Sequence, residues 1–314
     1  MIVEDKKLIG VSEEDVVSGK FVVPDGITSI GDNAFRDCIN LTSVEIPDSV
    51  TQIGACAFAE CKNLTNIDLP DNVEQIGLGA FAGCRSLESI KIPNGVTHID
   101  NSTFFGCVSL TSITIPDSVT SIGYYAFSDC SSLTSVDLPD GITSIGYYAF
   151  SDCSSLTDIA IPNGVTRIDD ETFYYCSSLK NVVIPDSVTH IGDRAFFKCE
   201  SLTSLTLPES ITHIGHEAFA ECASLTSISL PASVANIDNS IFSECHSLKN
   251  ITLTYGKDDP LVEKSDYSSQ ESKIINYDEK EDPLSDNFVG QNESNFATDD
   301  FSVTNEKESA DDAR

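Results

Sequence analysis

Residues 130 to 152 read CSSLTSVDLPDGITSIGYYAFSD, and the same pattern of residue types returns every 23 residues through most of the 314-residue chain. Ten of the twelve prolines keep this step, as do ten of the eleven cysteines and ten phenylalanines. These three columns begin at Pro24, Phe35 and Cys38. Because three residue types share one period, the sequence predicts a repeat architecture.

Within one unit, the strand signal comes first. Leu133, Val136 and Leu138 have the spacing of a short strand with one buried face. Pro139 follows directly and lacks an N–H, so it keeps the strand short. The Asp-Gly pair after it predicts a tight turn with the proline at its second position.

The second half of the unit closes the coil. Ile142 and Ile145 are expected to point inward, and Gly146 to permit a bend. Ala149 and Phe150, with a cysteine three residues further on, have a spacing that suits one turn of α-helix or 3₁₀ helix. One such unit buries too little apolar surface to fold alone, so units must stack on their neighbours. Ten rungs about 4.8 Å apart give a solenoid roughly 50 Å long, with its strands in a parallel sheet.

A longer rhythm is superimposed on the 23-residue period. The glycine of the unit is replaced by Asp100, Asp169 and Asp238, which are 69 residues apart. Thr103 and Thr172 stand at two of these sites where most units have alanine. We infer growth by duplication, partly in blocks of three units.

The pattern C-x-x-L-x-x-I-x-I-P-x-x-V-T-x-I-G-x-x-A-F-x-x-C, over about residues 20–253, resembles the BspA-like, or Treponema-type, leucine-rich repeat. The resemblance implies a right-handed solenoid with a parallel β-sheet on its concave face and short helical or irregular turns on its convex face. It also implies a role in adhesion or protein–protein contact on microbes. The unit lacks the regular inward asparagine of the commoner leucine-rich repeat, and proline with a Val/Ile column occupies that stretch.

The two ends of the chain depart from the repeat. Residues 1–19 are expected to form an irregular cap that shields the open end of the core. Residues 254–314 hold 17 acidic and 6 basic residues and predict a disordered acidic tail. Two apolar islands in it, Ile274–Ile275 and Phe288–Val289, are alternatives for docking on the last repeat or binding a partner.

Composition limits the classes of partner. The chain has 50 acidic and 18 basic residues and a formal net charge of -32. A nucleic-acid partner or an anionic lipid surface would require clustered cations, so neither is expected. A protein partner, one alternative being a partner with a basic surface, fits better. No apolar run is long enough for a transmembrane helix. No standard secretory signal is visible, so a cytoplasmic location, export without a cleaved signal and a cell-surface location all stay open.

Cysteine and histidine columns raise the question of disulfides and metals. Column cysteines lie one rung apart, within disulfide range, but their spacing is that of a buried packing position, and we expect reduced thiols. Cys56 is off the column and is expected to be exposed. His190, His213 and His216, with Asp193, form a conceivable zinc or nickel set. An ordinary exposed slot is the simpler interpretation, and no metal or cofactor is predicted.

Two further columns describe the surface. An acidic or amide residue follows nearly every proline, which suits the turn and alternatively forms an anionic stripe: Asp25, Asp48, Asp71, Asn94, Asp117, Asp140, Asn163, Asp186 and Glu209. The outward strand positions, from Ser43 and Glu45 to Ser227 and Ser229, are mostly small and polar, which favours a broad surface over a deep pocket.

Aromatic side chains outside the core are the candidate binding residues. Residues 120–134 and 143–157 are identical and contribute a Tyr-Tyr pair each. Phe105 shares a column with two of the aromatic residues further along the chain. The predicted binding residues are Tyr124, Tyr125, Tyr147, Tyr148, Tyr174 and Phe197. Such side chains suit interface anchors, and the alternative is that half of them tuck into the loops between rungs.

No catalytic set is apparent. The serines lie in repeated slots without a Gly-x-Ser-x-Gly turn, and no glycine-rich phosphate loop precedes a helix. The sequence therefore predicts a non-enzymatic protein–protein interaction scaffold with a long acidic repeat surface. The alternative is a microbial surface adhesin or exported effector that binds a host protein or glycan.

Overall fold

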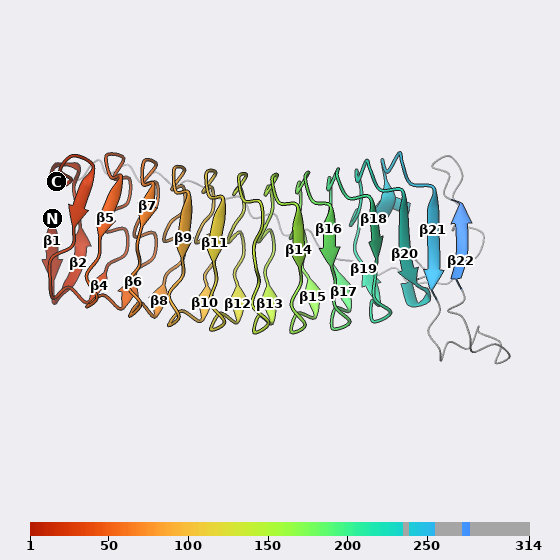
Figure 1. Cartoon of the computed structure of the whole chain (residues 1–314), viewed down its shortest axis with the longest axis horizontal. Coiled ribbons are helices and arrows are strands. Elements are labelled where there is room, and N and C mark those ends of the chain that lie inside the picture. Colours follow the sequence, from red (N-terminus) through yellow and green to blue (C-terminus); the bar gives the residue numbers. More distant parts are fainter. Residues whose placement is uncertain (235–238, 255–271, 277–314) are drawn as a thin grey trace, which may run out of the picture.

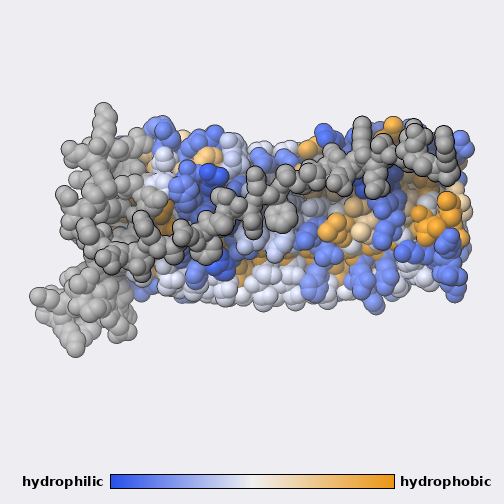
Figure 2. Space-filling view, turned by 180° about the vertical axis from the view of Figure 1, so that it is seen from behind, coloured by the Kyte–Doolittle hydropathy of each residue, from blue (hydrophilic) through white to orange (hydrophobic). Residues whose placement is uncertain are grey.

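The computed structural model describes residues 1–234, 239–254 and 272–276 of the chain. It is a solenoid of about eleven turns that follow one another along a rod (Figure 1). Strands form two series, one along the upper and one along the lower half of each rung in that view. From behind, the surface is mostly hydrophilic or pale, with orange patches that include the end carrying the N-terminal rungs (Figure 2). Among the described residues, no helix is long and apolar enough to cross a membrane.

The first series follows the Leu-x-x-Val-x-Leu segment of each unit, as the sequence predicts. Its neighbours pair in parallel at a step of 23 residues, as Asp158 pairs with Asn181. The strands are β3 (Lys20–Val22), β5 (Ser43–Glu45), β7 (Asn66–Ile67), β9 (Ser89–Lys91), β11 (Ser112–Thr114), β14 (Asp158–Ala160), β16 (Asn181–Val183), β18 (Ser204–Thr206), β20 (Ser227–Pro231) and β21 (Asn250–Thr254). A single bridge from Ser135 to Asp158 stands in place of a strand at residue 135.

The second series follows the proline turn and is shorter. Most of its strands have two residues, one exposed or half-buried and the next a buried isoleucine. They are β2 (Lys7–Gly10), β4 (Ser29–Ile30), β6 (Gln52–Ile53), β8 (Gln75–Ile76), β10 (His98–Ile99), β12 (Ser121–Ile122), β13 (Ser144–Ile145), β15 (Arg167–Ile168), β17 (His190–Ile191) and β19 (His213–Ile214).

The turn between the two series starts one position later than predicted. The Ile142 N–H donates to the Pro139 carbonyl at 3.1 Å, so the proline is the first residue of the turn and not the second. Where serine follows the acidic residue, its hydroxyl donates to the preceding rung, as from Ser118 to the Val96 carbonyl at 2.6 Å. The turn therefore adds to the contacts between rungs.

The Ala-Phe segment is not a helical turn in most rungs but a third ladder between rungs. The N–H groups of Tyr125, Phe127 and Asp129 donate to carbonyls of the next rung at 2.8–3.0 Å, and alternate N–H groups donate back three residues within the rung. Tyr125 and Asp129 have φ of 55° and 60°, and this left-handed pair repeats from Asn33 and Asp37 to Glu217 and Glu221. Among the rungs as far as the structure describes them, this segment forms a 3₁₀ helix in the last one, η3 (Asn239–Phe242).

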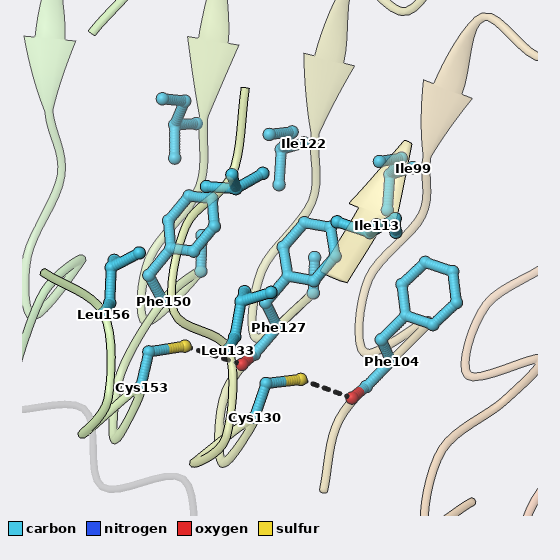
Figure 3. Packing of buried hydrophobic residues seen from close by; sticks show 14 of the residues in the cluster. Ile99, Phe104, Ile113, Ile122, Phe127, Cys130, Leu133, Phe150, Cys153 and Leu156 are labelled. Atoms are coloured by element: carbon cyan, nitrogen blue, oxygen red, sulfur yellow. Dashed lines mark hydrogen bonds between the residues drawn. The ribbon is translucent and has the colours of Figure 1, made fainter. Parts of the chain in front are cut away.

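The core is a spine of one phenylalanine per rung (Figure 3). The rings of Phe127 and Phe150 are fully buried and stack with centroids 5.2 Å apart and planes 10° from parallel. All eleven cysteines are free, as predicted, and the ten column thiols are buried. The Cys153 thiol donates to the carbonyl of Phe127 in the preceding rung at 3.2 Å, and the column thiols from Cys61 to Cys245 do the same. The Cys38 thiol donates to the Val11 carbonyl instead. A small apolar side chain with one weak donor therefore fits this position.

The glycine column reflects a lack of space for a side chain next to the preceding rung, and not a bend of the backbone. A Cβ at Gly146 would lie 2.9 Å from the backbone N of Tyr124 and 3.0 Å from the carbonyl carbon of Gly123 in the preceding rung. At two of the positions where aspartate replaces this glycine, a threonine three residues further on hydrogen-bonds the aspartate backbone. The hydroxyl of Thr103 donates to the Asp100 carbonyl at 2.7 Å, and the Thr172–Asp169 pair repeats the contact.

Antiparallel strands close one edge of each series. The N-terminal residues form a β-hairpin that the sequence did not indicate, in which β1 (Ile2–Glu4) pairs with β2, and η1 (Glu13–Asp15) follows. At the other end, Thr254 stands where the column has proline, and β22 (Ser272–Asn276) pairs antiparallel with β21. The Ile274–Ile275 island lies in β22, whereas Phe288–Val289 and the rest of the predicted tail lie outside the described residues. The domain limits at 19 and 253 stay predictions.

Candidate functional site

The predicted aromatic residues lie on one side of each rung, beside the third ladder of hydrogen bonds. We call this side the turn face, and we call Tyr124, Tyr125, Tyr147 and Tyr148 the tyrosine ladder. The left-handed backbone at Tyr125 and Tyr148, with φ of 55° and 56°, is unusual for a bulky side chain. Because the ladder residues are 23 apart, each tyrosine lies beside its equivalent in the next rung.

The tyrosine ladder contains two stacks with different geometry. Tyr125 and Tyr148 stack with centroids 4.6 Å apart and planes 9° from parallel. Tyr124 and Tyr147 lie 5.3 Å apart and are tilted by 48°. Tyr124, Tyr125 and Tyr147 remain 48%, 39% and 39% exposed. The rings therefore cover each other in part and still present edges and tilted faces to solvent.

Tyr148 is the inner member of the ladder. It is half-buried and hydrogen-bonds Glu171 of the next rung. Burial and the Glu171 hydrogen bond raise the pKa of the Tyr148 phenol well above its usual value. Burial also raises the pKa of Glu171. This contact joins the ladder to a second group of side chains.

That second group, the aromatic–ionic cluster, consists of Glu171, Tyr174, Tyr175, Arg194, Phe197 and Lys198. Tyr174 and Phe197 stack with centroids 5.1 Å apart, and both are half-buried. The Lys198 ammonium donates to the Tyr175 hydroxyl at 2.9 Å and lies 4.8 Å from the centre of that ring.

Acidic side chains of the next rung complete the cluster. The Arg194 Nε lies 2.7 Å from a carboxylate oxygen of Glu217, and the Lys198 Nζ lies 3.0 Å from one of Glu221. These cations are therefore matched within the molecule.

The six predicted residues thus divide into two kinds. Three ladder residues, Tyr124, Tyr125 and Tyr147, are exposed. Tyr148 is half-buried, as are Tyr174 and Phe197, which lie in a cluster whose charges are already paired. The alternative that half of the aromatic residues tuck between rungs describes Tyr148, Tyr174 and Phe197. Sequence reasoning missed Tyr175 and Lys198, although their shared column with Asp129 and Asp152 was available as a signal.

The stretch of sequence that carries the tyrosine ladder is acidic. No lysine or arginine occurs between Lys91 and Arg167, and seven aspartates lie in the same stretch. Asp129 and Asp152 belong to the turn face beside the ladder. Burial first, and then the neighbouring Asp152 carboxylate, raise the pKa of Asp129. The central rungs therefore combine exposed tyrosines with carboxylates that have no lysine or arginine in their own rungs.

The other predicted surface columns are placed as follows. The residues after the prolines, from Asp25 to Glu209, are all exposed. The outward positions of the first series are mostly exposed, and Val183 is 62% exposed among them. Neither column contributes a side chain to the groove described below.

The histidines do not form a metal cluster within the described part of the chain, where no group of three histidine, cysteine, aspartate or glutamate side chains is arranged to hold a metal ion. The rings of His190 and His213 lie 5.7 Å apart. Burial, Arg167 and His213 lower the pKa of His190. Cys56 is half-buried and not exposed as predicted.

A shallow groove of about 780 Å³ runs along the second series near the N-terminal end. Gly54 and Gly77 are part of its lining, together with Gln52, Gln75 and His98. The sequence analysis did not indicate it. None of the six predicted aromatic residues contributes to it.

Comparison with known proteins assigns the repeat. The sequence profile of the BspA type leucine rich repeat region, built of six copies, matches residues 18–133, 97–196 and 166–268. No curated protein matches the chain.

Similar solved structures are bacterial leucine-rich repeat proteins. One from Eubacterium ventriosum is 26% identical with a TM-score of 0.52, covering 75% of this chain and 66% of its own. A leucine rich cell surface protein from Faecalibacterium prausnitzii is 28% identical with a TM-score of 0.39, covering 77% of this chain and 89% of its own. The Treponema pallidum leucine-rich repeat protein is 32% identical with a TM-score of 0.45, covering 59% and 78%.

Proposed function

The chain belongs to the BspA-type leucine-rich repeat family, and we propose that it is a non-enzymatic interaction scaffold whose tyrosine ladder binds a protein with a basic surface. The observation that carries the proposal is the coincidence of three exposed tyrosines with a stretch that has seven aspartates and no lysine or arginine. Exposed aromatic residues are typical anchors of protein interfaces.

Charge explains why the partner is basic. The aromatic–ionic cluster neutralises its own cations, but the carboxylates beside the ladder, Asp129 and Asp152, have no lysine or arginine in their own rungs. Arginine and lysine side chains of a partner can bind such carboxylates, and an arginine can also stack on a tilted tyrosine. Complementary charge also speeds the encounter of the two proteins at low salt.

The repeat supplies rigidity and not chemistry. Each rung is held by strand pairs and by the ladder of the turn face, so the tyrosines are ordered before a partner arrives. Preorganised anchors lose less conformational entropy on binding. Because repeated columns offer no convergence of acid, base and nucleophile, a binding role fits better than a catalytic one.

The test uses a labelled 16-residue peptide of alternating arginine and serine, with an alternating glutamate and serine peptide for comparison. We expect the full chain to bind the basic peptide, and the variant with all four ladder tyrosines changed to serine to bind at least tenfold more weakly. A variant with Asp129→Asn and Asp152→Asn should also bind more weakly. The matched control, Asp117→Asn with Asp140→Asn, removes the same charge from the same rungs at the proline turn and should bind as the unchanged chain does. Equal loss in both aspartate variants, or no loss in the tyrosine variant, would contradict the proposal.

A further inference from the structure

The groove along the second series is lined by one outward side chain from each of five successive rungs. We call these side chains the polar row: Lys7, Ser29, Gln52, Gln75 and His98, on β2, β4, β6, β8 and β10. Parallel pairing aligns the first four in register, so the row follows the rod at about 4.8 Å per rung (Figure 1). The volume of about 780 Å³ lies within the range of ligand sites, about 300–1,000 Å³.

Glycines make the groove hollow, and an aspartate marks where it ends. Gly54 and Gly77 lie two residues after Gln52 and Gln75 and line the groove beside them. In the next rung Asp100 takes the place of the glycine and is exposed. The lining does not extend past Asp100 along the chain. The groove therefore occupies the rungs before the first interruption of the glycine column.

The polar groups of the row are not used by the protein itself. Within the described part of the chain, the amides of Gln52 and Gln75 and the ammonium of Lys7 have no hydrogen-bond or ion-pair partner. The Nδ1 of His98 lies 2.6 Å from the Thr97 hydroxyl, and among the same residues its Nε2 has no partner. Each amide supplies two N–H donors and one carbonyl acceptor. The row thus offers donors and acceptors side by side.

Charge and chemistry define the class of ligand. The carboxylates of Glu74 and Asp100 also line the groove, and the chain has a net charge of -32, so a polyanion would be repelled. The two amides in the middle of the row carry no charge and give a basic peptide no ion pair. A neutral polyhydroxylated ligand fits, because a hydroxyl donates and accepts as an amide does.

We propose that the groove binds a neutral linear oligosaccharide, with successive sugar units lying along successive rungs. The Gln52 and Gln75 amides hydrogen-bond the hydroxyls of neighbouring units, and the C–H face of the sugar rings packs on Gly54 and Gly77. The repeat of the polymer then follows the repeat of the protein. None of the tyrosine-ladder residues lines the groove, so the inference goes beyond the proposed function and does not depend on it.

The first measurement places the labelled full chain on an array of immobilised cello-, malto-, manno- and N-acetylchito-oligosaccharides, with sulfated and sialylated glycans for comparison. Calorimetry with the best neutral oligosaccharide is the second. We expect binding to a neutral linear glycan. A pentasaccharide should bind at least fivefold more tightly than the corresponding disaccharide, because the disaccharide meets only part of the polar row.

A pair of variants tests the row itself. Gln52→Ser with Gln75→Ser should raise the dissociation constant for the oligosaccharide at least tenfold. Serine occupies this column in the rungs of the tyrosine ladder, so the fold accepts it. The matched control, Asn66→Ser with Asn181→Ser, also replaces two exposed amides by serine, but in the first series, and should bind as the unchanged chain does.

The arginine–serine peptide separates this site from the tyrosine ladder. The Gln52→Ser and Gln75→Ser variant should bind that peptide as the unchanged chain does, which also shows that the variant is folded. The variant with four serines in the tyrosine ladder should keep its affinity for the oligosaccharide. Binding to no neutral glycan, binding to anionic glycans alone, or equal weakening in both amide variants would overturn the proposal. Loss of peptide binding in the glutamine variant would overturn it too, since the groove would then receive a basic peptide.

Discussion

Alkaline pH should unfold this protein through its cysteine column. Burial raises the thiol pKa of Cys38 from 9.0 to about 11 and that of Cys107 to about 12, and it raises the pKa of seven further column thiols. A thiol whose pKa is higher in the folded state than in the unfolded state does not change the free energy of unfolding at a pH below its unfolded pKa. As the pH rises from the unfolded pKa towards the folded pKa, only the unfolded state ionises, and the free energy of unfolding falls. The sensitive window therefore begins near pH 9.

The magnitude follows from titration of the unfolded chain. At pH 9.5 a thiol with a pKa of 9.0 favours the unfolded state by about 0.8 kcal/mol when the folded thiol stays protonated. Nine thiols together give about 7 kcal/mol, which is comparable to the whole stability of about 5–15 kcal/mol of an ordinary domain. The folded rod should consequently lose most of its stability between pH 9 and pH 10.

Urea unfolding followed by circular dichroism at pH 7.5 and pH 9.5 measures this loss. The variant Cys130→Ala gives the matched comparison, because it should lose about 0.8 kcal/mol less than the unchanged chain over the same interval. Thiol reactivity should rise together with the loss of strand signal. A stability that falls by less than about 2 kcal/mol, or a Cys130→Ala variant with the same pH slope, would refute the reasoning.

Three further predictions concern the backbone and the repeat. Asp37→Gly should raise the free energy of unfolding by about 0.5–1 kcal/mol, because φ is 60° at this exposed residue and glycine adopts that conformation without strain. Gly106→Ala, where φ is 69°, should lower the free energy of unfolding by about 1 kcal/mol. Urea unfolding measures both. Gly146→Ala should cost roughly 1–3 kcal/mol in the same assay, since its Cβ would lie 2.9 Å from backbone of the preceding rung, and an unchanged midpoint would contradict the close approach. Deletion of residues 120–142 removes one rung and should give a folded, shorter rod with the same circular dichroism per residue, as scattering and spectroscopy can show.

The candidate site was predictable to the extent that it follows the repeat period. Residues 23 apart are neighbours, so the sequence alone placed Tyr125 beside Tyr148 and Tyr174 beside Phe197. It did not separate the exposed ladder from the half-buried residues, because exposure depends on what the adjacent columns hold. Glu171 meets Tyr148, and Lys198 meets Tyr175, as residues 23 apart in one column, so the period also predicts that these pairs are neighbours, but not that they hydrogen-bond.

The sequence by itself predicted the structural unit, its buried columns and the free cysteines. In a stack of units with a fixed period, residues one period apart are in contact. Tertiary structure alone decided where the proline lies in its turn, why the glycine column needs space, and which carbonyl each thiol meets. These features depend on the direction of backbone N–H and C=O groups between rungs. The repeated residue types do not reveal that direction. The antiparallel strands β1 and β22 were not predictable for a similar reason. Whether a strand pairs at the edge of a sheet depends on its neighbours and not on its own residue pattern.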